Sequence, residues 1–280
     1  MAAGRFTNNT DDFKHPQSSW ISASQRGQNK SAKKTPETDA IFENVWRENK
    51  LADACPETLR ISIDTKAIVN VGEYSRHGRS RCLKPVGAWD HDMRVKEKLV
   101  PGGILEVISG RSFLPFTASN KTSDFMVDGL LAWWHQRRPE LSYIKRLVIN
   151  TDNGPECSGR RTRFLERAVQ FADETGLELH LVYYPPYHSK YNAIERYWGG
   201  LERSWNGYLL DSISTVINRA SNFAWKGVKT TVTLFEGIYE KGVKLTGKAK
   251  ENVEERLLRS QNLPWWDIII RPKNGTLASS

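Results

Sequence analysis

Three acidic side chains stand at positions from which they could bind metal ions together. Asp64 interrupts a strand-like stretch, Asp152 follows a short apolar run, and Glu195 opens a helical segment. Carboxylate oxygens are the ligands that Mg²⁺ and Mn²⁺ prefer in proteins. These three residues are therefore the set on which we base a catalytic hypothesis.

Each of these carboxylates also has a purely structural explanation. An Asp before Asn-Gly usually makes a turn, and a Glu in the first turn of a helix usually favours the helix dipole. An Asp inside a strand is harder to explain this way, because strands are depleted in Asp. For any one residue alone the structural explanation is favoured, but their joint placement around one α/β core reverses that preference.

The composition indicates a globular protein with an excess of basic residues. Its 280 residues are 39% hydrophobic, which is enough to bury the core of one large domain or two modest ones. The 41 Lys and Arg residues exceed the 32 Asp and Glu residues, giving a formal net charge of +9. Such a charge is expected of a protein that meets a polyanion, although it also fits an ordinary solvated surface.

Cysteine usage and hydropathy exclude several classes of protein. Cys55, Cys82 and Cys157 are odd in number and form no CxxC pair, so neither a disulfide framework nor a zinc site is indicated. No apolar run is long enough to span a bilayer, and the N-terminus has no hydrophobic signal core. We therefore expect a cytoplasmic protein without a membrane partner.

Changes in composition along the chain predict four regions. Residues 1–36 are polar and are expected to form a flexible arm, and residues 37–58 hold a helix that leads into the core. Residues 59–210 form the core, with a basic, glycine-containing insertion at about 73–103. Residues 211–280 are expected to form a helical C-terminal extension.

Hydrophobic periodicity predicts the order of elements in the core. Alternation with a period of two marks a strand from Leu59, and Gly110-Arg111 has the form of a tight hairpin turn between two further strands. Helical stripes and short apolar runs then alternate, and the last helix begins close to Glu195. The order strand, hairpin, helix, strand, helix, strand, helix is an α/β pattern, and open sheets of this kind build their sites at the C-terminal ends of strands.

This order, with carboxylates on the first strand, after the fourth and on the last helix, resembles the RNase H-like catalytic core of DDE transposases and integrases. Within that group the chain is most similar to the ISAzo-thirteen-like family of bacterial insertion-sequence transposases. The most specific matching segment is Ser189-Lys190-Tyr191-Asn192-Ala193-Ile194-Glu195, preceded by Pro185-Pro186. Further matches are residues 61–66, 122–125 with Trp133-Trp134, 176–179, 225–227 and 242–246. The resemblance covers nearly everything from residue 40 to residue 272.

The resemblance implies an RNase H-like mixed sheet flanked by helices, and a transposase that cleaves DNA strands and transfers them to a target. Asp64 would bridge two Mg²⁺ or Mn²⁺ ions, Asp152 would bind one of them and Glu195 the other. No organic cofactor is implied. The expected partners are the DNA of the element ends and of the target, with a homo-oligomer on the DNA, and the expected location is the cytoplasm in association with the nucleoid.

Basic side chains near these carboxylates are candidates for DNA contacts. They are Lys66, Arg79, Arg81, His188 and Lys190. Each could bind a backbone phosphate. An ordinary solvated side chain is the competing explanation.

Four other acidic residues could substitute for a carboxylate of the site. Asp90 and Asp92 lie in a loop near basic residues, where acids more often form surface pairs. Glu156 and Glu202 are ambiguous on the sequence alone. We therefore keep the first three carboxylates as the predicted set.

Two other functions fit the same residues. One is a catalytically idle DNA-binding or regulatory remnant of a transposase. Family members commonly carry a helix-turn-helix region, and residues 1–58 have no room for one, which favours this alternative. The chain would then be a truncated or split transposase. The intact Asp64, Asp152 and Glu195 argue against it. A nuclease of the RNase H type would share the site but would cleave RNA–DNA hybrids without joining strands.

Overall fold

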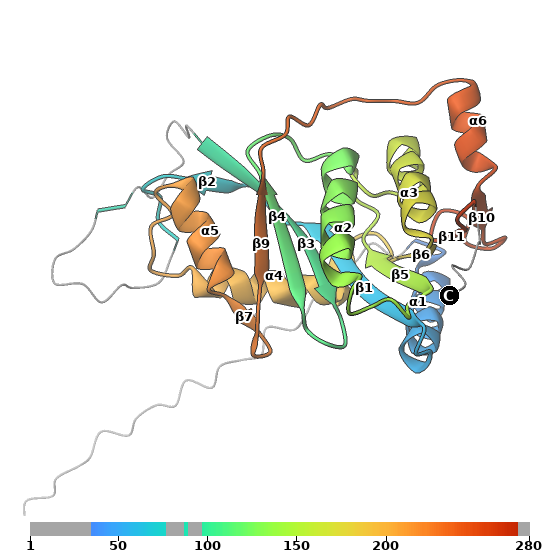
Figure 1. The fold of residues 1–280 in the computed structure, drawn as a ribbon, viewed down its shortest axis with the longest axis horizontal. Helices are drawn as coiled ribbons and strands as arrows, with labels where there is room; N and C mark the ends of the chain where they lie inside the picture. Colours follow the sequence, from blue (N-terminus) through green and yellow to red (C-terminus); the bar gives the residue numbers. More distant parts are fainter. Residues whose placement is uncertain (1–34, 77–86, 89–96, 274–280) are drawn as a thin grey trace, which may run out of the picture. The chain divides into compact units, whose positions relative to one another are not determined.

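A mixed sheet lies at the centre of the computed structural model, which describes residues 35–76, 87–88 and 97–273 (Figure 1). In spatial order its strands are β10 (Leu257–Arg259), β11 (Asp267–Ile270), β6 (Glu178–Tyr183), β5 (Arg146–Thr151), β1 (Thr58–Thr65), β3 (Glu97–Glu106), β4 (Ser112–Thr117) and β9 (Thr231–Phe235), and β2 (Val69–Val71) pairs with β3. Two further short strands, β7 (Ala224–Trp225) and β8 (Val228–Lys229), pair with each other.

The helices of the described ranges flank this sheet. They are α1 (Thr38–Ala54), α2 (Ser123–Arg137), α3 (Thr162–Thr175), α4 (Ala193–Ser204), α5 (Ile213–Ser221) and α6 (Lys248–Glu254), with a 3₁₀ turn, η1 (Ser189–Tyr191), before α4. None of them is long and apolar enough to cross a membrane.

The strand directions follow the predicted order of elements. β1, β5 and β6 run parallel, while β3 is antiparallel to both β1 and β4. The predicted hairpin is confirmed, but its turn is longer than the expected two residues: β3 ends at Glu106 and β4 begins at Ser112, so residues 107–111 connect them. Gly110 has a φ of 76°, and the Glu106 N–H donates to the Arg111 carbonyl at 2.9 Å. The predicted mixed α/β sheet flanked by helices is confirmed.

Helices cover both faces of the sheet. Figure 1 shows α2 and α3 in front of it and α4 behind it. On β1, the fully buried Ile61 and Ile63 belong to the core that α2 and α3 share. Arg60 and Ser62 alternate with them and face the other way, where Arg60 pairs with Asp53 of α1 and Ser62 accepts a hydrogen bond from the start of α4.

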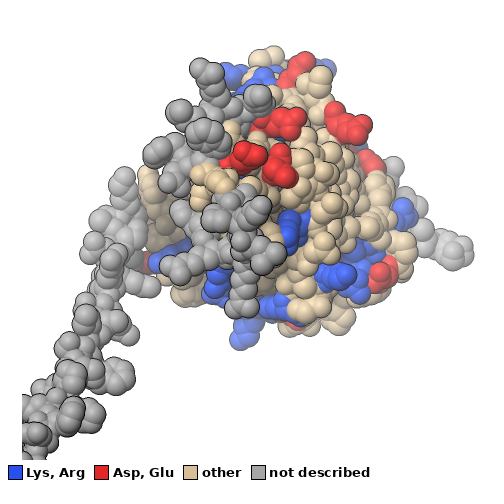
Figure 2. All heavy atoms as spheres, turned by 90° about the vertical axis from the view of Figure 1, so that its left-hand side faces the viewer, with Lys and Arg blue, Asp and Glu red and all other residues tan. Residues whose placement is uncertain are grey.

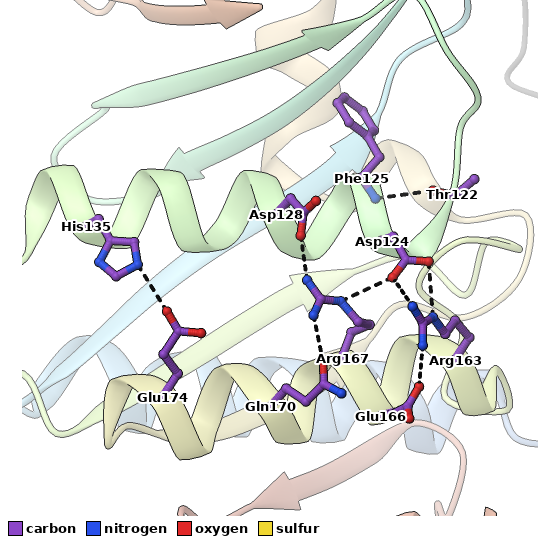
Figure 3. Close-up of polar contacts among 10 residues, drawn as sticks. All are labelled: Thr122, Asp124, Phe125, Asp128, His135, Arg163, Glu166, Arg167, Gln170 and Glu174. Carbon is purple, nitrogen blue, oxygen red and sulfur yellow. Dashed lines mark hydrogen bonds and ion pairs between the residues drawn. The ribbon is translucent and has the colours of Figure 1, made fainter. Parts of the chain in front are cut away.

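Ion pairs tie α2 to α3 (Figure 3). Asp124 Oδ1 lies 2.6 Å from Arg163 Nη2 and 3.2 Å from Arg167 Nε. Asp128 Oδ1 lies 2.5 Å from Arg167 Nη2. Partly exposed pairs of this kind add modest stability each, but together they neutralise the basic side chains on the facing side of α3.

Part of the predicted organisation lies outside the described residues. This holds for almost all of the expected flexible arm and for most of the expected insertion. The residues concerned in the insertion include Arg79, Arg81, Asp90 and Asp92. The predicted boundaries of the four regions stay predictions.

The end of the expected insertion is a strand, which corrects the sequence interpretation. β3 begins at Glu97 rather than at Ile104, so that Pro101-Gly102-Gly103 are paired residues and not a loop. Two glycines and a proline are usually a turn signal. Here Gly103 marks a close approach of another element, because a Cβ atom at this position would lie 2.5 Å from the Trp198 ring of α4.

The C-terminal extension is helical only in part. It contains α5 and α6, as expected, but it also adds β9 in parallel to β4 and β11 antiparallel to β6. The segments 231–235 and 267–270 are rich in β-branched residues and fit a strand. They pair with the open edges of the sheet, which would otherwise expose unpaired backbone groups.

We expect Gly103→Ala to lower the free energy of unfolding by about 1–3 kcal/mol, because the added methyl group would displace the packed Trp198 ring. Urea unfolding measures the change. Gly199→Ala is the matched control in α4, where an added Cβ meets nothing within 4 Å and a helical Ala should add about 0.5–1 kcal/mol. Equal stability of Gly103→Ala and the parent would contradict the close approach.

Candidate active site

β1 directs Asp64 toward the side of the sheet that carries α1 and α4. Successive side chains of a strand point to opposite faces, so Arg60, Ser62 and Asp64 share one face. Arg60 Nη2 lies 2.7 Å from Asp53 Oδ2 of α1, and Ser62 is fully buried against the start of α4. Asp64 therefore projects from the C-terminal end of β1 on the side of α4.

The register of β5 brings Asp152 beside Asp64. β1 and β5 are parallel, with Ser62 opposite Asn150, and each carboxylate lies two residues further along its own chain. Adjacent strands are about 4.8 Å apart. The two acids also share a face, because Asn150 Oδ1 accepts a hydrogen bond from Arg60 Nη1 at 3.2 Å.

A buried cluster of hydrogen bonds fixes the start of α4 on β1. Ser62 Oγ donates to Asn192 Oδ1 and accepts from the Ile194 N–H at 3.0 Å. Asn192 Nδ2 donates to the Ile63 carbonyl at 3.3 Å. Glu195 lies in the first turn of α4, directly after Ile194, so the cluster holds Glu195 next to the end of β1.

Gly103 gives α4 the room to approach. It is paired with Asp64 across the antiparallel ladder of β1 and β3. Because Gly103 has no side chain, the Ile194 and Trp198 side chains pack directly on β3. The same glycine that suggests a loop in the sequence therefore helps to bring Glu195 close to Asp64.

Burial and like charges raise the pKa of Asp64 to about 7. Burial of the carboxyl group is the largest cause, the charge of Asp152 is the next, and the charge of Glu195 acts in the same direction. A backbone hydrogen bond at Thr65 and the charge of Lys121 oppose the rise. The three predicted carboxylates therefore lie within electrostatic reach of one another.

The carboxylates converge on one edge without forming a closed cage. In the ranges 35–76, 87–88 and 97–273, no group of three or more His, Cys, Asp or Glu side chains is arranged to hold a metal ion. Like charges repel when no cation lies between them, so an open arrangement is expected. The oxygen ligands suit Mg²⁺ or Mn²⁺, whereas burial raises the pKa of the nearby Cys157 thiol and keeps it protonated.

Lys121 and Glu156 also belong to this edge; the sequence left Glu156 ambiguous and did not single out Lys121. Lys121 Nζ lies 3.4 Å from Glu156 Oε2, and Ser123 Oγ donates to the Glu156 carbonyl at 2.7 Å. These contacts tie the start of α2 to the turn after Asp152. Glu156 could be noticed because it follows Asp152 by four residues, but no sequence signal connects Lys121 with Asp64.

Three of the predicted DNA contacts lie among the described residues. Lys66 forms an ion pair with Glu202 of α4, and His188 is 7% exposed, with its ring against other aromatic rings. Lys190 is exposed, and its Nζ lies 5.2 Å from the centre of the Tyr191 ring. Lys66 and His188 therefore have partners within the protein, and a phosphate contact by any of the three stays a prediction.

Comparison with known proteins gives one family and several partly similar structures. The family described as the Rhodopirellula transposase DDE domain matches residues 18–272. No curated protein matches the sequence. The Mos1 transposase paired-end complex with the left transposon end is 9% identical, with a TM-score of 0.45, and the match covers 69% of this chain and 57% of that one.

Two further structures are similar at the same level. The Mos1 mariner paired-end complex with Mn is 12% identical, with a TM-score of 0.43, over 64% of this chain and 51% of that one. The HTLV-2 integrase catalytic core domain in complex with magnesium is 17% identical, with a TM-score of 0.34, over 62% of this chain and 92% of that one. The chain spans little more than half the length of the Mos1 chains.

We expect Ser62→Ala to lower the free energy of unfolding by about 1–3 kcal/mol, because it leaves the buried Asn192 Oδ1 and the Ile194 N–H without this partner. Ser221→Ala is the matched control, since its hydroxyl only supplements a helix carbonyl four residues earlier. Urea unfolding compares the two variants. Equal and small losses in both would argue against the role of the Ser62 cluster.

A second expectation concerns pH. The Asp64 carboxyl has a pKa near 3.8 when unfolded and about 7 when folded, so the folded state binds its proton more tightly. The unfolding free energy of metal-free protein should therefore fall as the pH rises from about 4 to 7, by up to about 4 kcal/mol.

Asp64→Asn should remove this fall, while the exposed Asp211→Asn should keep it. The measurement is urea unfolding with a chelator present, at several pH values from 4 to 8. If the parent and Asp64→Asn lose stability in parallel, Asp64 is not the group responsible.

Proposed function

Because the chain belongs to the transposase family described as the Rhodopirellula transposase DDE domain, we propose that Asp64, Asp152 and Glu195 are the catalytic triad of a DNA strand-cutting and strand-joining reaction. One observation carries this proposal: three carboxylates from separate elements meet at one edge of the sheet. The parallel register of β1 and β5 supports it for the first two residues. The hydrogen bonds of Ser62 to the start of α4 support it for the third.

Divalent cations fit this edge chemically. The available ligands are carboxylate oxygens, and the mutual repulsion that raises the pKa of Asp64 is what a bound cation would relieve. Two Mg²⁺ or Mn²⁺ ions, when bound, would activate the attacking hydroxyl and stabilise the leaving oxygen of an in-line displacement. We assign Asp64 to both ions, Asp152 to one and Glu195 to the other.

The remaining residues of the edge would position the DNA. Lys121 carries a positive charge within reach of Asp64 and could bind an oxygen of the scissile phosphate. Glu156 pairs with Lys121 and would hold it in place. The nucleophile would be water in the first step and the freed 3′-hydroxyl in the second, so the protein need not supply one.

The same proposal defines the partners. The substrate would be the DNA of the element ends and of the target, held by a homo-oligomer of this chain. Association with the nucleoid would follow from binding to DNA. The assignment of element ends and target as substrates depends on the transposase activity, whereas binding to DNA does not.

Two alternatives are separated from this function by experiment. An idle DNA-binding remnant would bind DNA without cutting it, although the intact triad argues against this possibility. A nuclease of the RNase H type would cut RNA–DNA hybrids but would not join strands. A strand-transfer assay with the terminal repeats of the element distinguishes all three, because only a transposase forms joined products.

We expect Asp152→Asn to reduce Mg²⁺-dependent DNA cleavage at least about a hundredfold, since removing a metal ligand should cost no less than removing one of its hydrogen-bonded supports. The amide keeps the shape of the side chain, including the oxygen that accepts from the Gly154 N–H at 3.1 Å. Folding and non-specific DNA binding should therefore persist. Asp211→Asn is the control of equal charge change, and near-normal cleavage by purified Asp152→Asn would exclude Asp152 as a ligand.

A further inference from the structure

The net charge of +9 does not by itself mark a DNA-binding face. Figure 2 shows Asp and Glu side chains gathered on one part of the visible face, with Lys and Arg side chains on other parts. Other basic residues are neutralised by neighbours, as Arg256 is by Asp173 at 2.7 Å. A DNA-binding surface is therefore best sought where basic side chains gather without acidic partners.

A groove at the start of α3 meets this condition. It has a volume of about 210 Å³ and lies between the first residues of α3 and the segment that leads into α6. Its lining contains no acidic residue and five basic ones: Arg160, Arg161, Arg163, Lys244 and Lys250. We call it the α3 groove.

Most of these cations lack a counter-charge. Arg163 is neutralised by Asp124 and by Glu166, each at 2.6 Å (Figure 3). The other four form no ion pair with any carboxylate in the described part of the chain.

Arg160 joins the α3 groove to the reactive edge. Its side chain also lines a larger hollow of about 650 Å³, which reaches Asp152 and the turn that follows it. The Arg160 guanidinium lies 5.1 Å from the centre of the Trp265 ring, a contact that favours a fixed position for the charge. A path with unpaired positive charges therefore runs from Asp152 through Arg160 to Lys244 and Lys250.

We propose that the α3 groove binds the phosphate backbone of duplex DNA whose strand is cut at Asp152, an inference that rests on the function proposed above. Backbone contacts of this kind position a duplex without reading its sequence. They release condensed counterions, so binding weakens steeply as salt is added. The C-terminal extension contributes to this surface through Lys244 and Lys250, two exposed side chains that lie far from the triad in the sequence.

The test compares two double variants that remove the same charge. Lys244→Gln/Lys250→Gln changes the α3 groove. Lys145→Gln/Lys229→Gln changes two exposed lysines elsewhere, of which Lys145 precedes β5 at the end opposite Asp152. Fluorescence anisotropy with a labelled duplex at several salt concentrations gives the slope of log K against log salt.

We expect the groove variant to reduce this slope by about 1.8, which is about 0.9 for each lost phosphate contact, and the control variant to leave it nearly unchanged. All four lysines are exposed, and the Lys145–Glu57 ion pair at 2.5 Å is exposed as well, so it adds little stability and thermal unfolding should be nearly unaffected in both variants. Equal slopes in the two variants would overturn the assignment of the groove, as would an unchanged slope in the groove variant.

Cleavage by the same preparations is read separately, so the two proposals can fail independently. If the parent protein cleaves with Mg²⁺ but the groove variant and the parent have the same slope of log K against log salt, the assignment of the groove is wrong and the proposed catalytic function is supported. If the parent never cleaves but the groove variant shows a reduced slope of log K against log salt, the proposed catalytic function is wrong and the proposed DNA-binding surface is supported.

Discussion

The buried hydrogen bonds of Ser62 with Asn192 and with the Ile194 N–H are the interaction on which the candidate site depends. Asp64 lies on β1, Asp152 follows β5 and Glu195 lies on α4, and the charges of the last two repel that of Asp64, so the site needs a scaffold that holds the three carboxylates together. The β ladder does this for the first two. The third has no ladder, and the Ser62 cluster replaces it by fixing the first turn of α4 on β1. Breaking a buried cluster of this kind leaves polar groups without partners, which makes the position of α4 well defined.

Repulsion between the carboxylates of the site lowers the stability of the folded protein when no cation is bound. A carboxyl group with a pKa near 7 beside two other acids costs stability at neutral pH, and Lys121 compensates for only part of that cost. Functional sites often carry such a cost because activity needs it. Here the repulsion would favour the binding of divalent cations, because a cation held between the carboxylates would reduce their mutual repulsion. Repulsion between the carboxylates would therefore account both for the lower stability of the metal-free protein and for the proposed binding of cations.

The C-terminal extension connects the fold with the proposed DNA surface. β11 pairs with β6, and Arg259 lies 4.6 Å from the centre of the Trp265 ring, which Arg160 also contacts. The segment that completes the sheet therefore also helps to hold the Arg160 side chain between the α3 groove and the reactive edge. A change that loosens this segment would affect the stability of the sheet edge and the binding of DNA together.

The sequence by itself determined the order of elements and the family resemblance, and it supplied the hypothesis of three carboxylates beside strand ends, because all of these are patterns along the chain. The tertiary structure alone decided that Pro101-Gly102-Gly103 belong to a strand, that Lys66 is paired with Glu202, and that Lys121 is paired with Glu156. Each of these depends on a contact between residues far apart in the chain. Composition and periodicity show what a residue type can do. They do not show whether a glycine forms a turn or allows a close approach, or whether a lysine is free or paired, because that depends on the residues that folding brings next to it.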